Sequence, residues 1–185
     1  MSWLSSSETL WPTLNITRGN SPIKLNCIDI TRVKMQIFRN LLTNKELDFV
    51  NSVLRQERWG FGYISNDPEK PIWNFDKASG KEVAELITSK LQLQYTLLDW
   101  HINGQTPQQQ TAIHNDSVKG ATLAFVFFPN DWRYEWGGRL HILEKTSTII
   151  TPEKNLGILF DANILHYAEA PVVNKLRVSI GLKLK

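Results

Sequence analysis

Two histidines and one aspartate have the types and the spacing of ligands to a single metal ion. His114 and Asp116 are two positions apart, and His166 follows much later in the chain. In an extended segment, residues i and i+2 point to the same side, so His114 and Asp116 can hold one ion together. Two imidazoles and one carboxylate can hold Fe(II) on one face and leave other coordination positions open. The pattern therefore predicts an iron centre of His114, Asp116 and His166, which would also be the catalytic residues.

The final segment, residues 177–185, predicts a strand that carries a cation on its more polar face. Apolar residues alternate there with a second set, which is Arg177, Ser179, Gly181 and Lys183. A guanidinium that points into the protein needs an anionic partner, and a carboxylate in a bidentate pair suits it best. We therefore expect Arg177, with Ser179 on the same face, to hold a carboxylate near the metal ion.

Further motifs make the region from residue 101 to residue 185 resemble a known enzyme family. In order along the chain they are Asn103-Gly-Gln-Thr106, His114-x-Asp116, Trp132, Trp136-Gly-Gly138, Pro152, Gly157, Phe160-Asp161, His166, Pro171 and Arg177-x-Ser179. This half of the chain resembles the Fe(II)- and 2-oxoglutarate-dependent dioxygenases of the prolyl 4-hydroxylase-like superfamily. The resemblance implies a double-stranded β-helix, iron held by the two histidines and the aspartate, and 2-oxoglutarate held through Arg177, with Ser179 as a further contact. His101 is included as a candidate cosubstrate contact, although it departs from the family pattern.

The activity implied by this resemblance is hydroxylation of a C–H bond in a prolyl residue of a peptide or protein, with release of succinate and CO2. Its implied cofactors are Fe(II), 2-oxoglutarate, O2 and L-ascorbate. A free amino acid or small molecule as substrate, and a jelly-roll module that binds metal without turnover, remain alternatives. Enzymes that demethylate nucleic acids carry a second arginine where this chain has Lys183, and no basic cluster is present, so no nucleic-acid partner is expected.

Three positions depart from the family pattern. Where many relatives have a tyrosine before the Asn-Gly-Gln-Thr motif, this chain has His101, which either contacts the cosubstrate or is structural. Where relatives often place a tyrosine facing the tail of 2-oxoglutarate, we expect Phe127. Arg139 follows the two glycines, where it would change the substrate rim. His141 is expected to be structural rather than a fourth metal ligand.

Length and composition are those of one globular domain, residues 1–185, without a membrane span. The chain is 42% hydrophobic and 21% charged, with a net charge of +3. Cys27 is the only cysteine, which favours a reducing compartment. The first ten residues lack the basic and apolar regions of a secretory signal. A soluble, intracellular protein in the cytoplasm, with no membrane partner, is therefore expected.

Periodicity and capping motifs predict a mainly β protein with flanking helices. Residues 1–21 would be an extension, 22–94 strand and helical support, and 95–185 the catalytic jelly-roll core of a cupin-like fold. Two capping boxes, Thr43-Asn-Lys-Glu46 and Ser79-Gly-Lys-Glu82, predict two N-terminal helices packed on one sheet. The remaining predictions are a strand over 23–42, a loop over 60–78, and core strands near 95–102, 120–128, 138–143, 147–150, 156–160, 166–169 and 176–184.

Overall fold

Two antiparallel sheets, two α-helices and two short 3-10 helices (Val118–Gly120 and Tyr134–Trp136) are the regular elements of the described part of the chain. A computed structural model describes residues 35–63, 67–91 and 95–185. The helices are α1 (Asn44–Leu54) and α2 (Lys81–Lys90). The strands are β1 (Gln36–Arg39), β2 (Trp59–Tyr63), β3 (Ile72–Phe75), β4 (Leu97–Gln105), β5 (Leu123–Phe128), β6 (Leu140–Leu143), β7 (Ser147–Ile150), β8 (Leu156–Asp161), β9 (Leu165–Ala168) and β10 (Arg177–Leu184). The predicted extension, residues 1–21, and most of the strand predicted over 23–42 lie outside the described residues.

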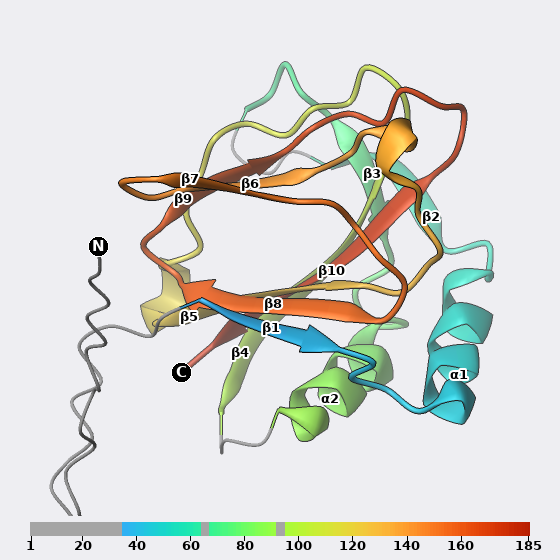
Figure 1. Cartoon of the computed structure of the whole chain (residues 1–185). Coiled ribbons are helices and arrows are strands. Elements are labelled where there is room, and N and C mark those ends of the chain that lie inside the picture. Colours follow the sequence, from blue (N-terminus) through green and yellow to red (C-terminus); the bar gives the residue numbers. More distant parts are fainter. Residues whose placement is uncertain (1–34, 64–66, 92–94) are drawn as a thin grey trace, which may run out of the picture. The chain divides into compact units, whose positions relative to one another are not determined.

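The large sheet has the strand order β1-β8-β5-β10-β4-β3-β2, and the small sheet has the order β7-β6-β9. The small sheet lies over one face of the large sheet, and both helices lie on the other face of the large sheet (Figure 1). After β5 the chain passes from the large sheet to β6 and β7 of the small sheet, back to β8, again to β9, and back to β10. Two packed antiparallel sheets connected in this way form a jelly roll. The prediction of a mainly β fold of this class is therefore confirmed.

Strand β5 shows why the core has two layers. All of its residues are buried, and successive side chains point to opposite faces of the sheet. Leu123, Phe125 and Phe127 join the apolar cluster on the helix side of the sheet. The alternate residues of the same strand join the cluster between the two sheets. The large sheet is thus covered on both faces, which explains why this strand is apolar throughout.

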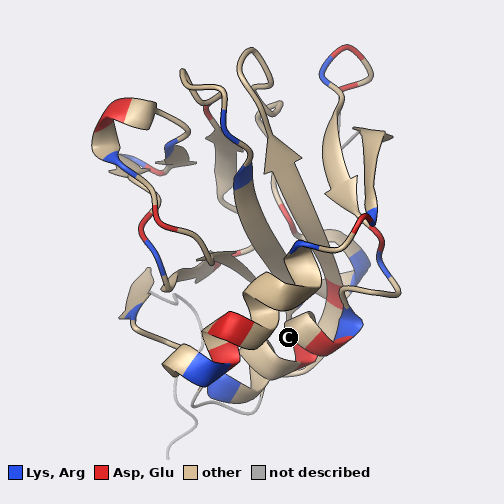
Figure 2. Cartoon of the chain, turned by 90° about the vertical axis from the view of Figure 1, so that its right-hand side faces the viewer, with Lys and Arg blue, Asp and Glu red and all other residues tan. Residues whose placement is uncertain are grey.

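The helices place their apolar residues against the sheet and their charges outward. The buried helical residues are Leu47, Val50, Val53 and Leu54 of α1 and Val83, Ala84 and Ile87 of α2. Charges of both signs lie along the two helices (Figure 2). The first capping box forms as predicted, because Thr43 accepts a hydrogen bond from the Glu46 backbone and the Glu46 carboxylate accepts one from the Thr43 backbone.

Two local predictions are wrong. Residues 60–78 are not only a loop, because β2 and β3 form a hairpin that pairs with β4 at the edge of the large sheet. The second capping box does not form: the N-cap of α2 is Gly80, with no side-chain cap. Ser79 instead donates from its backbone and its hydroxyl to the Asp76 carboxylate. Within the described residues, neither helix has the length and apolar character needed to cross a membrane.

Candidate metal centre

The side chains of His114, Asp116 and His166 converge on one point between the two sheets. Their ligand atoms all lie within 4.8 Å of one another. Residues 114 and 166 form an isolated antiparallel bridge, with backbone N–H to carbonyl distances of 3.0 and 2.8 Å. The Asp116 backbone N–H donates to the Ala162 carbonyl at 2.9 Å. The His-x-Asp segment therefore lies alongside β9 and continues the small sheet by one bridge.

Backbone carbonyls fix both imidazoles with the same nitrogen facing the centre. The Nδ1 atom of His114 is 2.8 Å from the Ala112 carbonyl, and that of His166 is 3.1 Å from the Ile164 carbonyl. A carbonyl oxygen can only accept, so Nδ1 carries the proton in each ring and Nε2 keeps a free lone pair. Such second contacts are how proteins orient metal-bound histidines.

The charges around this cluster suit a divalent cation. Burial lowers the pKa of His166, and the nearby His114 lowers it further, so the imidazole stays neutral. Burial acts to raise the pKa of Asp116, but His101, His166 and Lys183 together hold that pKa below its ordinary value. Neutral imidazoles and an ionised carboxylate are the protonation states in which these groups bind metal. The donor set therefore fits Fe(II).

Lys183 is a neighbour of this cluster that its sequence position did not reveal. Its Nζ atom lies 3.3 Å from Oδ1 of Asp116, while Nε2 of His166 lies 3.6 Å from Oδ2. The Lys183 side chain is 16% exposed and that of Asp116 is 6% exposed. One buried carboxylate thus faces a histidine on one side and a lysine on the other.

Arg177 is a fully buried cation at the other end of the same cavity. Its Nε donates to the Gly138 carbonyl at 2.6 Å, and Nη1 donates to Gln105 at 2.7 Å and to the Ser179 hydroxyl at 3.2 Å. Burial lowers its pKa to about 9, against an opposing effect of Glu169, so the guanidinium remains charged at neutral pH. Among the described residues, no carboxylate forms an ion pair with it.

Both glycines of the Trp-Gly-Gly motif have positive φ angles, and the second allows the close contact with Arg177. Gly138 has a φ of +68°, and a Cβ atom there would lie 2.9 Å from Cδ of Arg177. Any other residue would therefore be strained and would push the arginine away. The cavity between Arg177 and the histidines is small, about 40 Å³, and Asn103, Thr111 and Val126 also line it.

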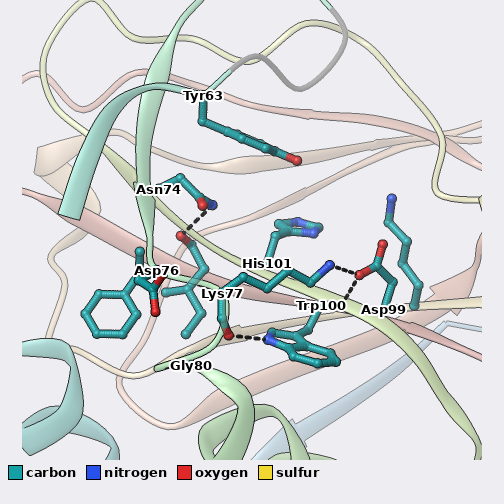
Figure 3. Close-up of a pocket in the computed structure, with 11 residues that line it drawn as sticks. Tyr63, Asn74, Asp76, Lys77, Gly80, Asp99, Trp100 and His101 are labelled. Atoms are coloured by element: carbon teal, nitrogen blue, oxygen red, sulfur yellow. Dashed lines mark hydrogen bonds and ion pairs between the residues drawn. The ribbon is translucent and has the colours of Figure 1, made fainter. Parts of the chain in front are cut away.

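His101 lies between this cavity and a second one. It lines both of them, and the second is shown in Figure 3. Burial lowers the pKa of His101 to about 4, so the ring is neutral at pH 7. On the paired strand, Gly181 leaves the room for this ring, because a Cβ atom there would lie 2.2 Å from Nε2 of His101. The position is consistent with the predicted cosubstrate contact, which stays a prediction.

The structure corrects or resolves the other departures from the family pattern. Phe127 does not face the cavity, because it points to the helix side of the sheet, and Val126 lines the cavity instead. Arg139 pairs with Glu169 at 2.8 Å. His141 stacks on Tyr167 and lies 2.6 Å from Glu169, so it takes a structural position away from the three metal-ligating groups.

Comparison of the fold with solved structures gives clear neighbours. A 2-oxoglutarate–Fe(II) oxygenase family oxidoreductase from Burkholderia pseudomallei matches with a TM-score of 0.65 and 10% identity, over 82% of this chain and 85% of the other. A prolyl-4-hydroxylase from Pseudomonas putida matches with a TM-score of 0.59 and 15% identity, over 84% and 95%. SnoN, a non-haem α-ketoglutarate-dependent epimerase from nogalamycin biosynthesis, matches with a TM-score of 0.61 and 13% identity, over 83% and 78%.

Sequence comparison adds no relative to these neighbours. No protein-family model and no curated protein matches the chain. The structural matches have low identity, so what they show is architecture. The chain therefore has the fold of the 2-oxoglutarate- and Fe(II)-dependent oxygenases of the prolyl 4-hydroxylase-like type.

Proposed function

We propose that this protein is an Fe(II)- and 2-oxoglutarate-dependent dioxygenase that hydroxylates a prolyl residue in a peptide or protein. The observation that carries the proposal is the pairing of two sites in one cavity. Three metal-ligating groups lie at one end, and the buried Arg177, without a carboxylate partner among the described residues, lies at the other. A dicarboxylate that binds a metal through one end and a guanidinium through the other would satisfy both sites.

The chain's own residues have distinct tasks in this proposal. His114, Asp116 and His166 would hold the metal, with L-ascorbate keeping it reduced, and Arg177 would hold the far carboxylate of 2-oxoglutarate, with Ser179 and His101 as further contacts. When bound, iron, 2-oxoglutarate and O2 supply the oxidising chemistry that releases succinate and CO2 and hydroxylates a C–H bond. Gln105 would orient Arg177, since its amide oxygen accepts from Nη1 and its amide nitrogen donates to the Gln109 carbonyl at 2.6 Å. The buried walls would exclude bulk water from the centre.

A small molecule or free amino acid is the second candidate substrate. The neighbours include both a prolyl-4-hydroxylase and an enzyme of nogalamycin biosynthesis, so this fold carries more than one substrate class. Function depends on the site rather than on the fold. The substrate therefore has to be found by experiment.

Succinate formation with product detection tests the proposed reaction. Protein loaded with Fe(II) would be incubated with ascorbate, 2-oxoglutarate, O2 and separate pools of proline-containing peptides and free amino acids. We expect succinate and a product heavier by one oxygen atom, detected by mass spectrometry, from the peptide pool. The His166→Ala variant is the matched control. If neither pool gives succinate above that control, hydroxylation of a prolyl residue or of a free amino acid is contradicted, and the alternative of a metal-binding module without turnover is favoured.

A further inference from the structure

A second cavity lies directly beside the candidate metal centre. It has a volume of about 90 Å³ and is lined by residues of β2, β3, β4 and β10. Tyr63, Asn74 and His101 line it (Figure 3). Lys183 also lines it, and its Nζ atom contacts Asp116. A molecule in this cavity would therefore lie beside Lys183, which contacts the metal-ligating Asp116.

The lysine on this wall has one carboxylate partner among the described residues, which is Asp116. Strand β10 turns the side chains of Arg177 and Lys183 to the same face, six residues apart, which corresponds to roughly 20 Å. The residues between them on that face are Ser179 and Gly181, both small. The strand thus carries one cation at each end of the space where metal and cosubstrate would bind.

The other charges of this cavity are already paired. Asp99 accepts from Lys77 and from Lys119, the latter at 2.9 Å. The Asp76 carboxylate accepts from the backbone and the hydroxyl of Ser79, at 2.8 and 2.7 Å. Asp99 thus compensates Lys77 and Lys119, and among the described residues Asp116 is left to compensate Lys183.

A metal ion changes this balance. When Asp116 binds a divalent cation, its negative charge is shared with the metal and no longer compensates Lys183. A largely buried ammonium without a counter-ion is unfavourable, so it would pair with an incoming anion. The hydroxyl of Tyr63 and the amide of Asn74 offer neutral hydrogen-bonding groups in the same cavity.

We propose that the cavity in Figure 3 is the substrate site and that Lys183 binds a carboxylate of the substrate. This inference rests on the proposed function and adds the charge of the substrate to it. The carboxylate is either the α-carboxylate of an amino acid or chain end, or an acidic side chain beside the reacting residue. Both sources share the same chemistry, and an experiment with defined probes separates them.

The test measures binding of small probes without turnover. Protein loaded with Mn(II) and saturated with 2-oxoglutarate is titrated with N-acetyl amino acids, including N-acetylproline, with their primary amides, and with N-acetylaspartic acid α-amide. Binding is followed by the paramagnetic relaxation of the probe protons. We expect the acids to bind about tenfold or more tightly than their amides, since a charge-assisted pair contributes at least that factor. If N-acetylaspartic acid α-amide binds more tightly than the other primary amides, and the α-carboxylates give no such gain, the carboxylate belongs to a side chain.

Variants separate the role of Lys183 from a general effect of positive charge. Lys183→Met and Lys183→Gln should both abolish the preference for acids, and Lys183→Arg should keep part of it. Lys119→Met is the matched control, because this lysine contacts Asp99 and is exposed, and it should keep the preference. A preference for acids that survives in Lys183→Met and Lys183→Gln would overturn the proposal, as would equal binding of acids and amides to the wild type.

Metal and cosubstrate binding are measured first in the same samples. If both bind and no probe carboxylate is preferred, the substrate proposal fails while the proposed function stands. If the wild-type protein binds neither Mn(II) nor 2-oxoglutarate, both proposals fail.

Discussion

Arg177 is fully buried and forms no ion pair with a carboxylate of residues 35–63, 67–91 or 95–185, so a single substitution can test the proposed cosubstrate site. A charge-assisted bidentate pair contributes about 1.5–3 kcal/mol. Arg177→Ala should therefore raise the 2-oxoglutarate concentration at half-saturation by about tenfold to a few hundredfold. Arg177→Lys should give an intermediate midpoint, because the ammonium keeps the charge but cannot form the bidentate pair of hydrogen bonds with the carboxylate. Titration of anaerobic Fe(II) protein, followed by its visible charge-transfer band, measures the midpoint.

The control for this prediction is Arg39→Ala, since Arg39 is exposed and pairs with Glu153. That variant should bind 2-oxoglutarate as the wild type does. An unchanged midpoint in Arg177→Ala would mean that another group binds the far carboxylate of 2-oxoglutarate. Arg177 would then be only a structural cation held by Gln105 and Gly138.

Asp116 is the only anion among the three metal-ligating groups, so its removal should affect the metal more than the fold. Asp116→Ala should weaken Mn(II) binding by more than about a hundredfold, since even outer contacts of metal ligands contribute about tenfold to a hundredfold. Activity should be lost with it. Electron paramagnetic resonance of free Mn(II) gives the affinity, and circular dichroism checks the fold. Binding as tight as in the wild type would remove Asp116 from the ligand set.

At the scale of the elements, Gly181 on β10 and His101 on β4 form a pair in which one residue makes room for the other. Gly181→Ala would place a Cβ atom 2.2 Å from Nε2 and 2.5 Å from Cε1 of the imidazole. The ring or the strand must then shift, so the free energy of unfolding should fall by about 1–3 kcal/mol. Urea unfolding measures this change.

Two further variants check the cause of that loss. Gly60→Ala is the matched control, because Gly60 is also a strand residue and its Cβ atom would meet nothing within 4 Å. It should leave stability nearly unchanged. In a protein that already carries His101→Ala, Gly181→Ala should lower the free energy of unfolding much less than it does in the wild type. If the two substitutions are simply additive, the close contact is not the source of the effect.

The elements also show how far sequence patterns reach. Alternation indicated β10, in which apolar and more polar residues take turns. β5 and β8 are instead continuous apolar runs, because both faces of the large sheet are covered there. The hairpin of β2 and β3 escaped this reasoning, because Phe61 and Tyr63 are exposed and Gly60 and Gly62 suggested a loop. It is held instead by backbone pairing to β4, which is distant in sequence.

Within the candidate site, the order of motifs along the chain identified the residues better than it predicted which side chains face the cavity. The motifs located the groups that the fold brings together at the metal centre and at Arg177. Phe127 was expected to face the cosubstrate, but its neighbour Val126 lines the cavity. In a strand, a shift of one residue exchanges the two faces. Contact between Lys183 and Asp116 depends on how β10 lies against the His-x-Asp segment, which no local pattern encodes.

At the scale of the whole molecule, burial of neutral histidines links stability to pH. The pKa of His101 is lowered to about 4 in the folded protein, against about 6.5 in the unfolded chain. Below pH 6.5 the unfolded chain therefore binds a proton that the folded protein does not, and stability falls as the pH decreases. Between pH 6.5 and pH 5 this group should contribute a loss of at most about 2 kcal/mol.

Urea unfolding of the metal-free protein at both pH values measures this loss. His166 shifts in the same direction, so the wild type is compared with His101→Gln, which keeps His166. The variant should lose less stability over this interval. Equal losses in the two proteins would mean that the ring of His101 is solvated well enough to titrate normally.

Few backbone hydrogen bonds join the His-x-Asp segment to β9, and this has a consequence for kinetics. The bridge between His114 and His166 is isolated, and beyond it Asp116 bonds to Ala162. A bound ion would cross-link these two segments through its ligands. In its presence the amide protons of His114 and His166 should therefore exchange with deuterated solvent much more slowly. Amides in the middle of β5 should exchange at the same rate with and without the ion. The lifetime of the bound metal would then depend on how often these few backbone hydrogen bonds open, while both sheets stay intact.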